Sequence, residues 1–339
     1  MIMAPMPAVR ATPVSLIGQA EAEQTLVGAW ERGRLHHAWL LTGPEGIGKA
    51  TLAYQFARLV LAGTDPQGAM RRVTAGTHAD MLVIARGMDE KRQRLRTEIV
   101  LDDVRPVSTF LHRTAAEGGW RIVIVDGAEH LNRNAANALL KLLEEPPSRA
   151  LLLLTCSAPG RLLPTMRSRC RTLRLAPLTT GAMHEVMSGL LPDLTPDERQ
   201  SLIDLSDGSP GRAMALAADD GVALSALVKK ILSRTDLRPA LWSYEVADGI
   251  LRHDRGFSTF IGLLSATIST TIRRAVQDGW PAGLSAGQMV DGMSLLSSRP
   301  PEAWAGVCAD LAQLRDETEH LNLDKRQALL TSLSLLSGS

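Results

Sequence analysis

The chain has 339 residues, enough for two or three domains, and 45% of them are hydrophobic and 22% charged, as in an ordinary globular protein. Its formal net charge of +1 creates no overall field that attracts nucleic acid, so any such binding must come from local patches. Three scattered cysteines without a C-x-x-C pair argue against a zinc site or a disulfide framework and suit the cytoplasm. No apolar run reaches the roughly 18 residues that a membrane span needs.

The first part of the chain predicts an arm followed by a strand, a loop and a helix. Residues 1–15 lack the basic-then-apolar order of a secretory signal, and we expect a flexible N-terminal arm there. Residues 38–42, AWLLT, form an apolar run that ends in a glycine-rich turn. Apolar positions with helical spacing then continue to Gly63, which suits a C-cap. A phosphate-binding loop occurs in this context.

Strands and helices continue to alternate up to residue 178. Apolar runs predict strands at 80–84, 120–126, 150–157 and 171–178. Helices are predicted at 104–118 and 132–147, while the polar and basic stretch 85–99 predicts an exposed loop. This alternation favours an α/β domain whose parallel sheet has helices on both faces. The remaining residues predict helices only, with domain boundaries near 178 and 221.

The glycine-rich turn GPEGIGKAT, residues 43–51, nearly matches the phosphate-binding pattern G-x-x-x-x-G-K-[ST]. Glycines let backbone N–H groups approach phosphate oxygens at a helix N-terminus, and Lys49 would bind the terminal phosphates. The position that should supply a hydroxyl ligand for Mg²⁺ is Ala50, and the next hydroxyl points about 100° away around the helix. The candidate nucleotide-binding residues of this turn are Gly43, Gly46, Gly48, Lys49 and Thr51. A plain connecting turn is the less favoured alternative.

A second motif, RIVIVDGAEHL, resembles a Walker B strand that ends in the metal-holding Asp126. In active ATPases of the AAA+ class an acidic residue usually follows and orients the attacking water, but here Gly127 follows. Glu129 could substitute, although we favour a solvent-exposed acidic residue at that position. With both a metal ligand and this carboxylate missing, we expect no ATP turnover by the chain alone. Binding of ATP or ADP without hydrolysis stays open.

Four segments resemble bacterial clamp-loader subunits of the AAA+ family in order and spacing. These segments are HHAWLLTGPEGIGKATLA, NALLKLLEEPP, RLLPTMRSRC and DGSPGRAMAL. The resemblance covers about residues 16–220 with specific motifs and the remainder more loosely. The motor subunits of that family, gamma or tau, keep an intact phosphate-binding loop, the acidic residue after the Walker B Asp and a zinc module. This sequence departs from all three and is similar to the delta-prime type.

The resemblance implies an architecture and a role. It implies a RecA-like P-loop domain over 16–178, a small helical lid domain over 179–221 and an α-helical collar domain over 222–339. It also implies the stator of an assembly with gamma/tau and delta subunits, which loads the sliding β-clamp onto primed DNA in the cytoplasm. The chain would then be a subunit of a DNA-directed DNA polymerase assembly. The alternatives are an ATP-hydrolysing motor subunit and another AAA+ DNA-repair ATPase, and residues 50 and 127 speak against both.

The resemblance also assigns roles to single residues. Arg169, in the triplet SRC, matches an arginine finger that completes the ATP site of a neighbouring motor subunit, with a plain surface charge as the alternative. Ser157 lies in the sensor-1 region, and Arg212 matches a sensor-2 position, for which helix capping is an equally weighted alternative. The region 63–78 lacks the cysteines that bind zinc in many relatives, so we expect no zinc and interpret His78 as a loop residue.

Two further charged groups are assigned to the surface or to structure. The basic side chains of 85–99 could contact DNA phosphates, but Asp89, Glu90 and Glu98 dilute their charge, and we favour a solvated loop. Glu144 and Glu145 precede two prolines at a helix end, which favours a structural role over acid–base catalysis.

Overall fold

The structure is a computed structural model that describes residues 16–337 except 64, 90–93, 118, 219–220, 235–239, 254, 278–293 and 322. The chain forms two compact units. The first extends to Val186 and includes Gly208–Gly211, and the second comprises Met187–Asp207 and the residues from Arg212 onward. The predicted arm over 1–15 lies outside the described residues.

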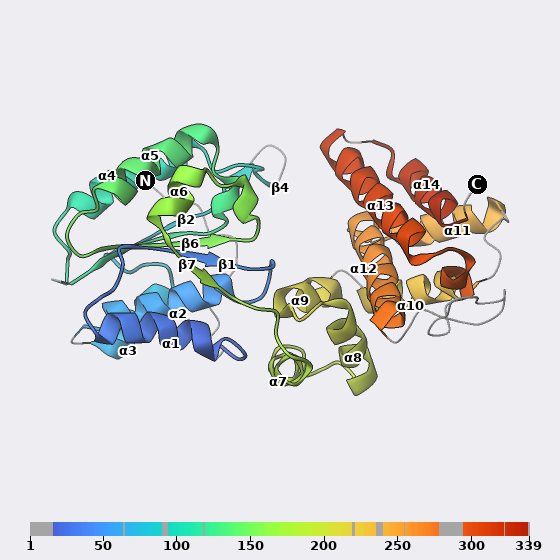
Figure 1. Ribbon diagram of the computed structural model, residues 1–339, viewed down its shortest axis with the longest axis horizontal. Helices are drawn as coiled ribbons and strands as arrows, with labels where there is room; N and C mark the ends of the chain where they lie inside the picture. The colour runs from blue at the N-terminus through green and yellow to red at the C-terminus, as the bar shows by residue number, and fades with distance from the viewer. Residues whose placement is uncertain are drawn as a thin grey trace. The chain divides into compact units, whose positions relative to one another are not determined.

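The first unit is built on a five-stranded sheet with the order β2-β5-β6-β1-β7 (Figure 1). All neighbouring pairs are parallel. The strands are β1 (Ala38–Thr42), β2 (Met81–Ile84), β5 (Arg121–Val125), β6 (Ala150–Cys156) and β7 (Arg171–Arg174). Every residue of β1, β5 and β6 is buried, as expected for the inner strands of a sheet covered on both faces. The predicted α/β class with a parallel sheet is confirmed.

Helices cover both faces of this sheet. On one side lie α1 (Ala20–Glu31), α2 (Lys49–Leu61) and α3 (Pro66–Thr74), and on the other α4 (Leu101–His112), α5 (Arg133–Glu144) and α6 (Pro164–Arg169) (Figure 1). Successive strand residues point to opposite faces. Trp39 and Leu41 therefore pack into the core beneath α1 and α2. Leu40 packs into the core beneath α4 and α5.

Three local features of the first unit differ from the predicted elements. Helix α3 was not predicted, although Asp65 caps it by accepting a 2.9 Å hydrogen bond from the Gly68 N–H. The segment 85–99, predicted as a loop, contains the antiparallel strands β3 (Met88–Asp89) and β4 (Arg94–Leu95). Helix α4 spans 101–112 instead of 104–118, because the Asp103 carboxylate accepts the Val100 N–H at 2.9 Å and fixes an earlier start.

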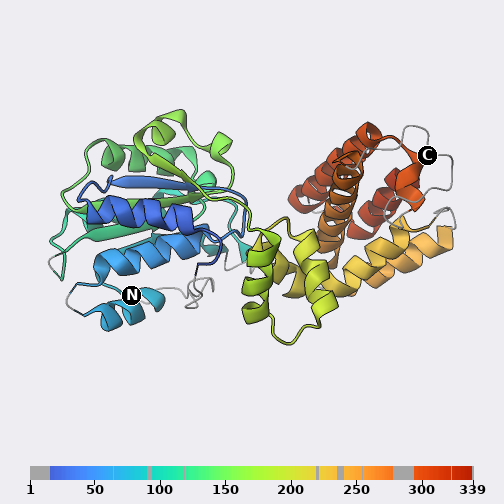
Figure 2. The ribbon, with the colours of Figure 1, turned by 60° about the horizontal axis from the view of Figure 1, so that its bottom comes forward.

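Among the described residues after β7 there are helices and connecting turns but no strand, as predicted. The helices of this part are α7 (Thr180–Leu190), α8 (Pro196–Leu205), α9 (Pro210–Ala218), α10 (Gly221–Leu232), α11 (Ala240–Leu251), α12 (Gly256–Gln277), α13 (Pro301–Leu321) and α14 (Lys325–Ser337). A short 3-10 turn occurs here at Ser294–Ser298, and two others occur before β7, at Ala128–His130 and Pro159–Arg161. Phe260 of α12 and Trp304 of α13 are buried. These helices are drawn in orange and red in Figure 2. The finer division into a lid over 179–221 and a collar over 222–339 stays a prediction. Among the described helices, none is long and apolar enough to cross a membrane.

Candidate functional site

The turn after β1 has the backbone shape of a phosphate-binding loop. Gly43, Gly46 and Gly48 have φ values of 145°, 78° and 102°, which side-chain-bearing residues rarely adopt. A Cβ atom at Gly43 would lie 2.5 Å from the Leu175 carbonyl oxygen, so this position has no room for a side chain. Helix α2 then begins at Lys49, with Gly48 as its N-cap. The predicted order of strand, loop and helix is confirmed.

Lys49 directs its ammonium group into its own loop. The side chain is nearly inaccessible, with the residue 7% exposed. Nζ donates hydrogen bonds to the Gly43 oxygen at 2.8 Å, the Pro44 oxygen at 2.6 Å and the Ser157 Oγ at 2.8 Å. An ammonium group has three N–H donors, so these contacts engage all of them. Ser157, for which the sequence predicts a sensor-1 position, is thereby a direct neighbour of the loop lysine.

Acidic groups balance the charge of this buried lysine. Burial lowers the pKa of Lys49, and the carboxylates of Glu129, Glu45 and Asp126 oppose that shift. The Glu129 Oε1 accepts the Ser157 N–H at 2.8 Å, while Oε2 is buried and has no hydrogen-bond partner. The predicted solvent-exposed position of Glu129 is therefore wrong. The 3-10 turn at 128–130 directs this side chain inward, toward the start of the loop after β6.

Asp126 directly follows β5 and lies within a set of hydrogen bonds. The Thr155 hydroxyl donates to the Asp126 Oδ1 at 2.6 Å and accepts the Gly127 N–H at 2.9 Å. Gly127 has a φ of 80°, and a Cβ atom there would lie 2.9 Å from the His130 ring. Gly127, where active AAA+ enzymes carry an acidic residue, thus has a left-handed backbone conformation that disfavours any side chain.

The segment 208–211 holds the outer side of the same loop. The Ser209 hydroxyl donates to the Glu45 oxygen at 2.7 Å, and the Gly211 N–H donates to the Gly46 oxygen at 2.9 Å. A Cβ atom at Gly211 would lie 2.7 Å from the Gly46 Cα, so the two backbones are in direct contact. Within the segment DGSPGRAMAL, the sequence analysis assigned a role only to Arg212. In the sequence, Gly208 and Gly211 flank Ser209 and Pro210. Glycine often marks a point where two backbones approach closely, so these residues could have indicated the contact.

Gln19 ties a third segment to the loop, and sequence reasoning missed this contact as well. The residue is 4% exposed. Its Nε2 donates to the Ala176 oxygen at 2.7 Å and to the Ile47 oxygen at 3.4 Å. The loop is therefore held by side chains from before α1, by the segment beyond β7 and by Lys49 itself.

These residues do not fit a site that hydrolyses ATP with magnesium. Ala50 offers no oxygen to a metal, and Gly127 offers no carboxylate to a water molecule. The donors of Lys49 are engaged by its own chain. Within the described part of the chain, no group of three or more His, Cys, Asp or Glu side chains could hold a metal ion. The glycines of the loop still present the backbone shape that binds phosphate.

Arg169 is the last residue of α6, separated from β7 by Cys170, and its contacts come from α5 and α6. Its Nη2 pairs with the Glu144 Oε1 at 2.8 Å, and its Nη1 donates to the Thr165 oxygen at 3.0 Å. The side chain is 35% exposed. A guanidinium in this position is held at the surface of the first unit and remains open to a further partner.

The other predicted site residues lie in separate surroundings. Arg212 pairs with Asp207 at 3.0 Å within the second unit. Thr51 lies in the first turn of α2 and is partly buried. In the basic segment, Arg96 pairs with Asp103 at 2.7 Å, while Lys91 and Arg92 lie outside the described residues. His78 is a loop residue, as predicted, but it is buried.

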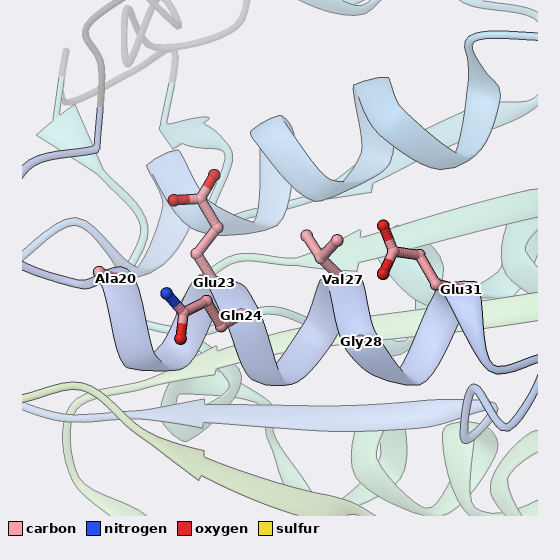
Figure 3. Close-up of a pocket in the computed structure, with 6 residues that line it drawn as sticks. All are labelled: Ala20, Glu23, Gln24, Val27, Gly28 and Glu31. Carbon is pink, nitrogen blue, oxygen red and sulfur yellow. The ribbon is translucent and has the colours of Figure 1, made fainter.

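A shallow hollow of about 310 Å³ is present on α1, apart from these residues (Figure 3). Its lining is Ala20, Glu23, Gln24, Val27, Gly28 and Glu31, all from the one helix. No residue that the sequence marked as a site residue lines it, so the hollow adds nothing to the candidate site.

The family match lies within the first unit. A sequence model of the family described as DNA polymerase III, delta subunit, matches residues 18–179. DNA polymerase III subunit delta′ of Pseudomonas aeruginosa is 40% identical over 193 residues, which are 55% of this chain and 57% of that protein. The Escherichia coli K12 subunit of the same name is 36% identical over 210 residues, 58% of this chain and 59% of that protein. The chain thus spans less than two thirds of the length of these relatives.

A solved structure gives a weaker likeness. The gamma subunit-related protein of Thermotoga maritima matches with a TM-score of 0.40 and 18% identity, over 92% of this chain and 98% of that one, which is too low a score to support an inference. The family match, in contrast, includes the glycine-rich loop, Asp126 and the segment around Arg169. That match and two relatives of the same name agree, so the chain is similar to delta′ subunits of DNA polymerase III over the part that they cover.

Proposed function

We propose that this chain is the stator subunit of a clamp loader, that it does not hydrolyse ATP, and that it lends Arg169 to the ATP site of a motor subunit. The partners are gamma/tau and delta subunits and, through the assembly, the sliding β-clamp and primed DNA. The similarity to delta′ subunits supports the assembly role. The chain needs no cofactor of its own and no zinc, and any ATP or ADP that binds to its loop stays uncleaved.

One observation carries this proposal: Lys49 and Arg169 differ in how far their N–H donors are free to contact another molecule. All three N–H donors of Lys49 are engaged inside the loop. Arg169, in contrast, keeps 35% of its side chain exposed at the end of a short helix. A guanidinium inserted from a neighbouring subunit stabilises the charge of the transferring phosphoryl group and contributes roughly 10³–10⁵ in rate in known cases. Of the two cations, Arg169 is the one able to act outside its own chain.

ATP hydrolysis tests the proposal. The purified chain should show no turnover, with or without primed DNA, and should raise the DNA-dependent ATPase of a complex with gamma/tau and delta subunits. Arg169→Ala should abolish this increase. Arg167→Ala is the matched control, because Arg167 is an exposed arginine of the same helix. Turnover by the chain alone that disappears in Lys49→Ala would identify a motor subunit instead.

A further inference from the structure

The Arg169 guanidinium is held on two sides by acceptors of its own unit. Nη2 pairs with the Glu144 Oε1 at 2.8 Å. Nη1 donates to the Thr165 carbonyl oxygen at 3.0 Å and lies 3.4 Å from the Ser168 hydroxyl. A free arginine side chain has many rotamers, and ordering it costs about 2 kcal/mol of conformational entropy. These contacts place the guanidinium in one orientation before any partner arrives.

Glu144 is attached to a rigid part of the first unit. It is the last residue of α5, whose Leu142 and Leu143 side chains are buried in the core. The Leu143 carbonyl oxygen is also 3.0 Å from the His37 Nε2. Two prolines follow at 146 and 147 and stop the helix. The backbone that carries the Glu144 carboxylate is therefore held in place.

Helix stability does not explain an acidic residue at this position. The C-terminus of a helix carries a partial negative charge, so a carboxylate there is unfavourable by a few tenths of a kcal/mol. The ion pair itself contributes little to folding, because Glu144 and Arg169 are 47% and 35% exposed and such surface pairs are worth about 0–1 kcal/mol. Orientation of Arg169 is the remaining effect of the pair.

We infer that Glu144 is a positioning residue for Arg169 and that it acts on catalysis in the neighbouring subunit only through that arginine. This inference rests on the proposed function of Arg169. A phosphate oxygen accepts a charge-assisted hydrogen bond from a guanidinium as a carboxylate does, so the neighbour's nucleotide would find N–H donors already aligned. The chain offers a matched control in Glu145, an exposed acidic residue next in sequence for which the described contacts include no ion pair.

The test compares Glu144→Gln and Glu145→Gln in the clamp loader reconstituted with gamma/tau and delta subunits. We expect Glu144→Gln to lower the kcat of the DNA-stimulated ATPase about five-fold, the effect of one exposed charge-assisted contact, with KM for ATP unchanged. Glu145→Gln should match the unsubstituted chain. Both variants should keep the thermal unfolding midpoint and co-elute with their partners.

A double variant separates positioning from a general structural effect. In the Arg169→Ala background, adding Glu144→Gln should cause no further loss, because the residue acts through the missing guanidinium. A further loss there, or a Glu144→Gln rate equal to or above that of Glu145→Gln, would overturn the inference. If Arg169→Ala itself keeps full stimulation, the proposed function fails as well, so the two failures are distinguishable.

Discussion

At the scale of single residues, the Lys49 ammonium group binds acceptors of its own chain. Its three hydrogen bonds join the beginning of the loop to the residue after β6. Burial lowers the pKa of this lysine, and nearby carboxylates compensate in part. Such an arrangement favours the loop conformation that is present, because each carbonyl oxygen that Lys49 engages would otherwise be less well satisfied.

Removing the Lys49 ammonium group should therefore reduce stability. Lys49→Met keeps most of the volume of the side chain but leaves the Gly43 and Pro44 oxygens without their donor, so we expect a loss of about 1–3 kcal/mol. Urea unfolding of the full chain measures it. Lys141→Met, an exposed position on α5, serves as the control. Unchanged stability together with lost ATP binding would mean that the lysine contacts phosphate instead.

Restoring the missing acidic residue should not restore an ATPase. Gly127→Glu places a side chain at a φ of 80° and close to His130, which should cost about 1–3 kcal/mol. Ala50→Ser is the contrasting variant, since position 50 lies in the first turn of α2, where serine adopts the helical backbone without strain. We expect the double variant to be less stable than Ala50→Ser alone and still inactive in steady-state hydrolysis. Turnover by the double variant would show that only these two groups were missing.

At the scale of elements, the contact between the segment 208–211 and the loop depends on glycine at the point where two backbones meet. In Gly211→Ala the new Cβ atom would lie 2.7 Å from the Gly46 Cα. Overpacking of this kind outweighs the small gain in helix propensity, so we expect a net loss of about 1 kcal/mol. The backbone amides of residues 43–49 should also exchange their hydrogens faster in this variant.

Gly189→Ala is the matched control for that variant. Gly189 lies in α7 with open space around the position of its absent Cβ, so alanine there should raise stability by up to about 1 kcal/mol. Equal stability and equal exchange for the two variants would show that the segment 208–211 does not hold the loop in solution.

At the scale of the whole molecule, three histidines of the first unit make its stability depend on pH. Burial lowers the pKa of His37, His78 and His130. A lowered pKa means that the unfolded chain binds the proton more tightly than the folded one. The stabilisation is therefore complete above the unfolded pKa of about 6.5 and is lost as the pH falls below it.

We expect the urea midpoint to fall between pH 7.5 and pH 5.5. His78→Asn should reduce this dependence of the urea midpoint on pH, because asparagine does not titrate. Its amide oxygen can replace Nδ1 as acceptor of the Asp80 N–H. His112→Asn, at an exposed position of α4, is the control. An identical pH slope in both variants would contradict the assignment to His78.

Features that leave a clear pattern in neighbouring residues were predicted from the sequence, and features without such a pattern were not. Strand β1, the glycine turn and the start of α2 were predicted because apolar spacing and glycine are local signals. The start of α4 and the β3–β4 hairpin were not, because short strands and a single capping carboxylate leave little pattern. Glu129 was placed wrongly, since the direction of a side chain after a strand depends on the turn that follows.

The sequence by itself determined which chemical groups the loop lacks, because the absence of a hydroxyl at position 50 and of a carboxylate at position 127 is a matter of residue identity. It also determined the alternation of strands and helices. Only the tertiary structure decided that Lys49 is satisfied by Ser157, that Ser209 holds Glu45, and that Glu144 holds Arg169. These partners are far apart in the chain, and packing of the sheet and its helices alone brings them within hydrogen-bond distance.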